Sequence, residues 1–532
     1  MDGNVTFLGE FSKKLVANTF FNFLGRCWSF ILTLLLTPYI LSRLDVHDFG
    51  TWVLMTIFIS AFNPGQVPLF DLGGVFMKYI SEYYTYEDYE GINRVLVCGL
   101  FFYGLFGIAL TSGGLLLERP LFHLFHISDG ASSAYFLVLV ASAISNISAM
   151  LLAVFKGIQR MDKSNSLEIR LSILNAAGTI VFLRIGWGIF GLAANALLNA
   201  GLAVIVTWWA LRRMIPKIRM SAHLDKTLLG DMLAYGMKMQ VSSVGALVSF
   251  QVPKLIISRF LGTAAVSFYE VSSRLTLFMR ALPLVMISAL IPATSELRAR
   301  KDRDRILQTY LMASKYVAML TVAMAAFLIT EARSVLTLWL GKGFESSVVL
   351  VQILAIGFGA NILGGPASQT GAGVGRPEYD MRGTVLLAVL TPILGIALVH
   401  SFGAAGAAAG TTIAFCAATG YLLVAFHRNY VRNSVRTVLE TIYLRPIAGG
   451  VFGALAVMGF HPLVPQLSAW DSVRYMIPIK LGVDFGVFAA VYLVVLVVFR
   501  QVTAIDWNNF LSLISFGLQF LRHPSRMLSD EN

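Results

Sequence analysis

Apolar segments of about 20 residues follow one another along almost the whole chain. A helix of that length crosses roughly 30 Å of hydrocarbon at 1.5 Å per residue, so each segment is long enough to span a bilayer. Hydrophobic residues make up 57% of the chain and charged residues only 13%, which excludes an ordinary soluble domain. The chain is therefore expected to be an all-α polytopic membrane protein.

We predict about fourteen spans, of which twelve form two sets of six. The first set covers 15–41, 50–77, 92–117, 132–155, 166–187 and 188–211. The second set covers 228–258, 265–292, 310–331, 346–371, 382–401 and 405–426, and a final pair lies near 446–465 and 475–499. The expected parts are an N-terminal lobe (1–215), a C-terminal lobe (216–427), an extra helix pair (428–500) and an amphipathic tail (501–532).

The two sets of six share sequence features in the same order, about 215 residues apart. The pairs are Ser81-Glu82 with Ser295-Glu296, Arg43 with Arg259, Gly157-x-x-Arg160 with Gly373-x-x-Arg376, and Gly188-x-x-Gly191 with Gly403-x-x-Gly406. Two like halves of a membrane protein usually enclose a central pathway. The repeat therefore predicts two pseudo-symmetric six-helix lobes around a central cavity, and it favours transport.

Basic residues are concentrated in alternate loops between the predicted spans. The net charge is +12, and the basic loops carry Lys156/Arg160/Lys163, Arg212/Arg213/Lys217/Arg219, Arg298/Arg300/Lys301/Arg303/Arg305 and Arg428/Arg432/Arg436. The positive-inside rule places these loops in the cytoplasm, so both termini are expected there and the number of spans is even. The tail repeats apolar residues at helical spacing and either lies along the inner membrane surface or has no role.

The sequence carries no sign of catalysis, a cofactor or nucleic-acid binding. It contains no phosphate-binding loop that ends in Gly-Lys-Ser/Thr, and no soluble domain large enough for a transferase site. Cys27, Cys98 and Cys416 lie in apolar segments without metal-ligand spacing, so a disulfide framework is not expected. The histidines near outer loops, including His400 and His461, form no metal constellation, and we assign them no chemistry.

Polar residues form a stripe on the first predicted span of each half. In the first span the stripe includes Asn22 and Arg26, with Thr33 and Thr37 further along the same helical face. The seventh span repeats the design with Gln251 and Lys254. Charges within membrane spans are costly and usually face a cavity or a partner. These polar groups either line a cavity or only join packed helices through hydrogen bonds.

The second span of each half adds further charges. Asp71 lies in one half, and Glu270, Arg274 and Arg280 lie in the other. Glu270 and Arg274 are four residues apart and can neutralise each other, whereas Arg280 is rotated away from them. Asp71 and Glu270 are candidate charge partners or ion-coupling groups, and an internal salt bridge to either is the alternative role for Arg26 and Lys254.

If the stripes face a cavity, that cavity is net cationic. Arginine binds phosphate through a bidentate fork and lysine binds it as a point charge. Asparagine, glutamine, serine and threonine suit sugar hydroxyls. The candidate binding residues therefore fit a phosphorylated glycan headgroup, and they are Asn22, Arg26, Gln251, Lys254, Arg274 and Arg280.

The order of short motifs resembles polysaccharide-export flippases. In the second half these motifs are Gln251-Val-Pro-Lys-Leu-Ile-Ile-Ser-Arg-Phe-Leu-Gly262, Phe268-Tyr269, and Ala289-Leu-Ile-Pro292 before Ser295-Glu296. The first half has Pro38-Tyr-Ile-Leu41, Asp48-Phe-Gly50 and Asp71-Leu-Gly73, and Leu338-Trp-Leu-Gly341 precedes the tenth span. These flippases, which include the Wzx-type O-antigen flippases, are part of the multidrug/oligosaccharidyl-lipid/polysaccharide (MOP) exporter superfamily.

The resemblance implies a flippase in a bacterial-type inner membrane that works by alternating access. Its substrate would be a polyprenyl-pyrophosphate-linked oligosaccharide, moved to the outer leaflet for surface polysaccharide synthesis, with membrane lipids and possible polymerase machinery as partners. Family members often carry an acidic residue where this chain has Pro253-Lys254, which puts an ion-coupling role there in doubt. The alternatives are a lipid II flippase, a cation-coupled multidrug antiporter and a membrane scaffold without transport.

Overall fold

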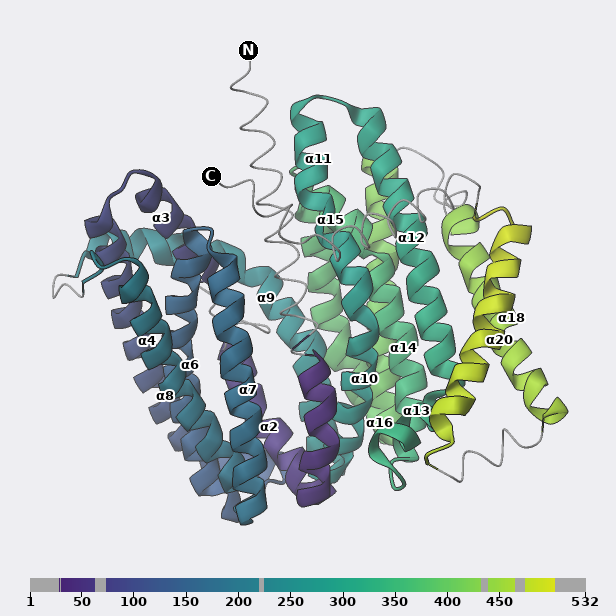
Figure 1. Ribbon diagram of the computed structural model, residues 1–532, viewed down its shortest axis with the longest axis horizontal. Helices are drawn as coiled ribbons and strands as arrows, with labels where there is room; N and C mark the ends of the chain where they lie inside the picture. Colours follow the sequence, from purple (N-terminus) through teal and green to yellow (C-terminus); the bar gives the residue numbers. More distant parts are fainter. Residues whose placement is uncertain are drawn as a thin grey trace. The chain divides into compact units, whose positions relative to one another are not determined.

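The structure is a computed structural model that describes residues 28, 30–62, 73–219, 224–431, 439–464 and 474–502 (Figure 1). Among these residues it contains helices and turns and no strand. Ten helical segments of the described chain are long and apolar enough to cross a membrane. The prediction of an all-α polytopic membrane protein is confirmed, while the count of about fourteen spans stays a prediction.

The helices follow the predicted spans closely. After a helix at Phe30–Arg43, the first half contains α2 (Val46–Phe62), α3 (Gly73–Thr85), α4 (Tyr89–Leu116), α5 (Glu118–Phe125), α6 (Ser132–Gly157), α7 (Met161–Ile185) and α8 (Gly188–Met214). The second contains α9 (Lys226–Leu261), α10 (Thr263–Ser288), α11 (Leu290–Ala299), α12 (Arg303–Thr330), α13 (Ala332–Leu340), α14 (Ser346–Leu363), α15 (Gly365–Gly373) and α16 (Glu378–Phe426). The last pair is α18 (Arg445–Phe460) and α20 (Ile477–Val498).

Several predicted boundaries differ in detail. The span predicted at 346–371 is two helices, α14 and α15, and α11 continues beyond the span predicted at 265–292. The spans predicted at 382–401 and 405–426 are the two arms of α16, which turns at Gly403 with φ 58° and ψ −140°. The short helices α5 and α13 are not among the predicted spans because they have eight and nine residues, too few to cross a bilayer.

The internal repeat is visible in the backbone turns. Glu87 and Lys301 both adopt positive φ, 55° and 58°, and each precedes an aspartate that caps the next helix. Asp88 accepts from the Gly91 amide at the start of α4, and Asp302 accepts from the Arg305 amide at the start of α12. Gly188 and Gly403, a pair matched in the sequence, adopt φ of 54° and 58°. The two halves therefore share their turn geometry as well as their motifs.

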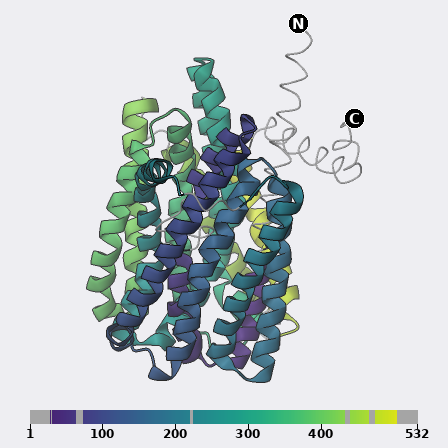
Figure 2. The same cartoon turned by 90° about the vertical axis from the view of Figure 1, so that its left-hand side faces the viewer.

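The chain divides into two compact units. The first comprises 1–285, 342–364 and 376–422, and the second comprises 286–341, 365–375 and 423–532. In the first unit α6 packs against α4 and α8, and α7 packs against α8 (Figures 1 and 2). In the second unit α12, α18 and α20 pack together around Val457, Phe488 and Tyr492.

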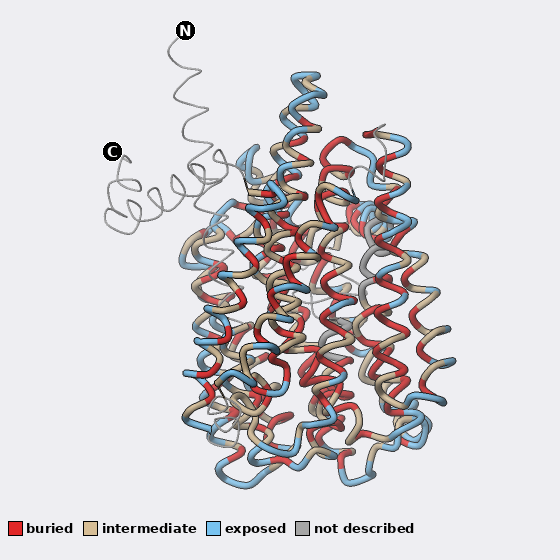
Figure 3. The backbone as a smooth tube through the Cα atoms, turned by 90° about the vertical axis from the view of Figure 1, so that its right-hand side faces the viewer, coloured by how far each residue is buried: buried red, intermediate tan, exposed pale blue. Residues whose placement is uncertain are grey.

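Apolar side chains remain exposed on the outer helices of each unit. Phe101, Leu105 and Ile108 on α4 are each at least half exposed, as are Val494 and Val497 on α20. Figure 3 shows buried and exposed positions alternating along the helices. Contiguous apolar surface of this kind suits contact with lipid rather than water. The protein is a multi-pass membrane protein.

Candidate functional site

Glu270 is the centre of a buried ion cluster in the first unit. Its Oε2 lies 2.7 Å from the Lys254 Nζ on α9, and its Oε1 lies 2.7 Å from the Arg274 Nε one turn along α10. The three side chains are 11%, 11% and 20% exposed, with arginine the most exposed. One carboxylate therefore holds two cations, and these three residues carry a net charge of +1.

Neutral groups complete the cluster. Lys254 Nζ donates to Gln251 Oε1 at 3.0 Å, and Arg274 Nη1 donates to Thr37 Oγ1 at 2.8 Å. The guanidinium of Arg274 also lies 5.3 Å from the centre of the Phe49 ring, within the range of a cation–π contact. The polar stripe of the first helix thus reaches the charges of α10 through Thr37.

Helical spacing accounts for much of this arrangement. Glu270 and Arg274 are an i,i+4 pair, so their side chains meet on one face of α10. Gln251 and Lys254 are an i,i+3 pair on α9. The ion pair between Lys254 and Glu270 links α9 to α10. These two residues are sixteen positions apart in the sequence.

Arg280 occupies a separate setting on α10. Its Nη2 donates to Asn361 Oδ1 of α14 at 2.9 Å. The guanidinium lies 5.0 Å from the ring centre of Phe250 and 5.5 Å from that of Phe358. Its Nε is buried without a hydrogen-bond acceptor, and no carboxylate among the described residues pairs with it.

The Glu270 cluster and the surroundings of Arg280 differ in how readily they could bind an anion. In the Glu270 cluster Lys254 Nζ and Arg274 Nε already donate to the carboxylate, so an anion would have to compete with Glu270 for these donors. Arg280 has an N–H without an acceptor and a positive charge without a counter-ion in the part of the chain that the structure describes. An oxyanion supplies both a hydrogen-bond acceptor and a negative charge. The edge of a guanidinium binds phosphate in a bidentate fork.

The structure brings three of the six candidate binding residues together with one candidate charge partner, and it places a fourth candidate separately. Gln251, Lys254, Arg274 and Glu270 form one cluster, and Arg280 lies with Asn361. Asn22, Arg26 and Asp71 lie outside the described residues. Lys254 pairs with Glu270, which is the internal salt bridge that the sequence left open as its alternative role.

Sequence reasoning missed the groups that surround Arg280. Asn361, Phe250 and Phe358 lie on α14 and α9, from 30 to 81 positions away from Arg280. No local spacing connects them with Arg280. Asn361 carries a weak signal, because it is one of the few polar side chains in the mainly apolar α14.

Comparison with known proteins gives matches of three kinds. A family model described as "Polysaccharide biosynthesis protein" matches residues 132–349. A curated relative is the "Probable low-salt glycan biosynthesis flippase Agl15" of Haloferax volcanii. It is 23% identical over 398 residues, which cover 72% of this chain and 77% of the relative.

Two solved structures show the same fold. The lipid II flippase MurJ in an inward closed conformation matches 91% of this chain and 99% of its own, with a TM-score of 0.66 and 16% identity. An inward-facing multidrug resistance MATE family transporter of the MOP superfamily matches 80% of this chain and 96% of its own, with a TM-score of 0.64 and 19% identity. The fold is therefore the one that MATE transporters and MurJ share.

Proposed function

We propose, from the confirmed resemblance to polysaccharide-export flippases of the MOP superfamily, that this chain is a membrane flippase of glycan biosynthesis. Its substrate is a polyprenyl-(pyro)phosphate-linked oligosaccharide. The flippase moves it from the cytoplasmic to the outer leaflet by alternating access, for surface polysaccharide synthesis. The protein acts in a bacterial-type inner membrane with both termini in the cytoplasm.

The observation that carries this proposal is the excess of positive charge on buried and half-buried side chains. Lys254, Arg274 and Arg280 stand against Glu270 as the only carboxylate paired with them in the described residues. A buried cation is costly unless an anion compensates it, so the excess favours an anionic ligand. A phosphate or pyrophosphate that carries sugars has the required negative charge. The hydroxyls of its sugars can form hydrogen bonds with side-chain amides such as those of Asn361 and Gln251.

Arg280 is the residue that we assign to the phosphate. Its buried Nε–H has no acceptor among the residues that the structure describes, and Phe250 and Phe358 limit where the guanidinium can point. Lys254 and Arg274, held by Glu270, add a net positive charge and can bind a second phosphate oxygen if Glu270 releases them. Arg26 and Asn22 of the first predicted span lie outside the described residues and stay candidates for binding the same headgroup.

The experiment compares lipid-linked glycans in cells with and without the protein. Loss of a flippase should leave a complete polyprenyl-pyrophosphate glycan in the cytoplasmic leaflet and abolish the surface polymer. Arg280→Ala should reproduce this phenotype at normal expression, because charge-assisted hydrogen bonds worth about 1.5–3 kcal/mol are removed, roughly 10- to 150-fold in affinity. Arg280→Lys should restore export only in part, since lysine keeps the charge and loses the fork.

The matched control is Arg259→Ala. Arg259 is an exposed arginine in the last turn of α9, and its guanidinium lies over the Phe260 ring. Export should remain normal in this variant. Normal export in Arg280→Ala would refute the assignment of Arg280, and an unchanged lipid-linked pool in cells without the protein would refute the flippase itself.

The likeness to two solved structures supports two alternative functions. The MurJ likeness supports a lipid II flippase, for which depletion of the protein should stop growth. The MATE likeness supports a cation-coupled multidrug antiporter, for which its loss should sensitise cells to toxic cations. An antiporter needs an acidic group that is available to the coupling ion, whereas Glu270 already holds two cations.

A further inference from the structure

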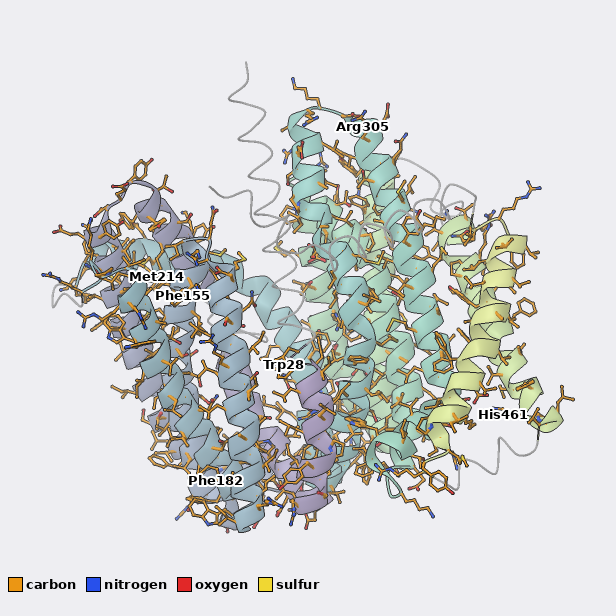
Figure 4. All side chains as sticks on the ribbon, in the orientation of Figure 1. Trp28, Phe155, Phe182, Met214, Arg305 and His461 are labelled. Atoms are coloured by element: carbon orange, nitrogen blue, oxygen red, sulfur yellow. The ribbon has the colours of Figure 1, made fainter. Side chains whose placement is uncertain are left out.

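Three side chains that can ligate a metal meet in the second unit, at one end of the extra helix pair. Glu331 lies between α12 and α13, His461 directly follows α18, and Asp484 lies on α20. One potential ligand atom from each lies within 4.8 Å of the others. Figure 4 labels His461 at the end of the α18–α20 pair where α13 also lies.

One carboxylate oxygen of Asp484 is buried and has no hydrogen-bond donor in the part of the chain that the structure describes. Its side chain is fully buried; Oδ1 lies 3.0 Å from His461 Nε2, whereas Oδ2 has no hydrogen-bond partner within the described residues. A buried carboxylate oxygen without a partner loses its hydration and gains nothing in return. Glu331 is also buried, but His461 is 25% exposed and leaves a route by which an ion could enter.

The charges around these side chains do not balance. Lys480 is the one cation that pairs with a carboxylate of the cluster among the described residues, with its Nζ 3.5 Å from Glu331 Oε2 and 2.9 Å from Ser334 Oγ. Two carboxylates against one ammonium leave a net charge of −1 when the imidazole is neutral. A buried negative charge of this kind favours uptake of a cation.

We infer that Glu331, His461 and Asp484 form a binding site for a divalent transition-metal ion of the zinc class. Imidazole together with carboxylates suits zinc, whereas magnesium and calcium prefer oxygen ligands alone. Zinc bonds of about 2.1 Å in a tetrahedron place ligand atoms about 3.4 Å apart. The 3.0 Å between His461 Nε2 and Asp484 Oδ1 is close to that separation.

The site would tie the extra helix pair to the repeated part of the chain. His461 and Asp484 belong to the pair, and Glu331 belongs to the junction of α12 and α13. A bound metal would therefore stabilise the attachment of α18 and α20 to α12 and α13. The inference is independent of the proposed transport activity, because it concerns residues outside the cationic site of the first unit.

The test uses tag-free full-length protein in detergent, stripped of metal with EDTA and titrated with Zn²⁺ by calorimetry. The expected result is one Zn²⁺ per chain, together with a melting temperature that rises with the Zn²⁺ concentration. Co²⁺ in place of Zn²⁺ should give visible absorption bands. The double variant His461→Ala/Asp484→Asn should lose binding at least 100-fold, while His400→Ala, at a ring that packs edge-to-face on Phe260 in the first unit, should bind normally.

Lys480→Met is the second variant, because it removes the ammonium that competes for Glu331. A metal site predicts Zn²⁺ binding at least about tenfold tighter than in the wild type, since a like charge is removed from beside the metal. An ion-pair network that binds no metal predicts neither binding nor this gain. The inference is overturned if the wild type and Lys480→Met both fail to bind Zn²⁺, or if binding survives in the double variant.

Discussion

At the scale of single residues, the same ion-pair spacing has opposite surroundings at two places in the chain. Glu270–Arg274 and Glu296–Arg300 are both i,i+4 pairs, with contacts of 2.7 and 2.6 Å. The first is 11% and 20% exposed, and the second is 64% and 65% exposed. Spacing therefore predicts that each pair forms, while burial decides how much stability is lost when one partner is removed.

Replacing Glu270 should show that difference directly. Glu270→Gln leaves the buried Lys254 and the half-buried Arg274 without a carboxylate, and we expect it to lower the free energy of unfolding by about 3–5 kcal/mol. Thermal unfolding in detergent measures the change. Glu296→Gln removes the exposed counterpart and should leave the melting temperature nearly unchanged; equal shifts in the two variants would contradict the prediction.

Asn361 should act through Arg280, because it accepts the hydrogen bond from Nη2. In Asn361→Leu the guanidinium keeps its charge and its two aromatic neighbours but loses this anchor. Export should fall by roughly 5- to 30-fold, in line with a loss of one to two kcal/mol, and less than in Arg280→Ala. The same assay of surface polymer in the double variant tests the dependence, because Asn361→Leu should add little once Arg280 is gone.

At the scale of helices, the two arms of α16 depend on glycines for their close approach. Gly403 forms the turn at φ 58°. A Cβ on Gly410 would lie 2.7 Å from the Gly395 nitrogen and 2.8 Å from the Leu394 carbonyl carbon. Those are backbone atoms, so the arms would have to move apart to make room.

Gly410→Ala should therefore destabilise the protein, although alanine is the better helix former. Overpacking typically costs about 1–3 kcal/mol, and the expected drop in melting temperature is measurable in detergent. Gly420→Ala is the matched control on the same arm, because a Cβ there has no neighbour within 4 Å. That variant should be neutral or slightly more stable, so a Gly410→Ala protein as stable as Gly420→Ala would contradict the close approach.

At the scale of the whole molecule, the repeat and the charge pattern make a joint prediction about topology. Loops 156–163, 212–219 and 298–305 should lie in the cytoplasm, and the turns near 126–131 and 341–345 should lie outside. Reporter fusions that are active on only one side of the membrane measure this at each loop. Reporters at the two termini should both be cytoplasmic, and opposite signals from them would rule out an even number of spans.

Much of the architecture could be predicted from the sequence because its causes are local. The length and apolarity of the segments predict the helices, and α4, α6, α8 and α20 begin and end within a few residues of the predicted spans. The repeat predicts two like halves, and the matched glycines Gly188 and Gly403 adopt similar positive φ. These properties depend on neighbours along one helix or on a fixed offset, so composition and spacing determine them.

Tertiary structure alone decided which charges have partners. The choice of Glu270 as the partner of Lys254, the surroundings of Arg280, and the meeting of Glu331, His461 and Asp484 all join residues on different helices. The electrostatic energy of a charged side chain in a membrane protein depends on the groups that lie within a few ångströms of it. Those neighbours come from helices far apart in the sequence, so only their packing distinguishes a neutralised cation from one that still lacks an anion.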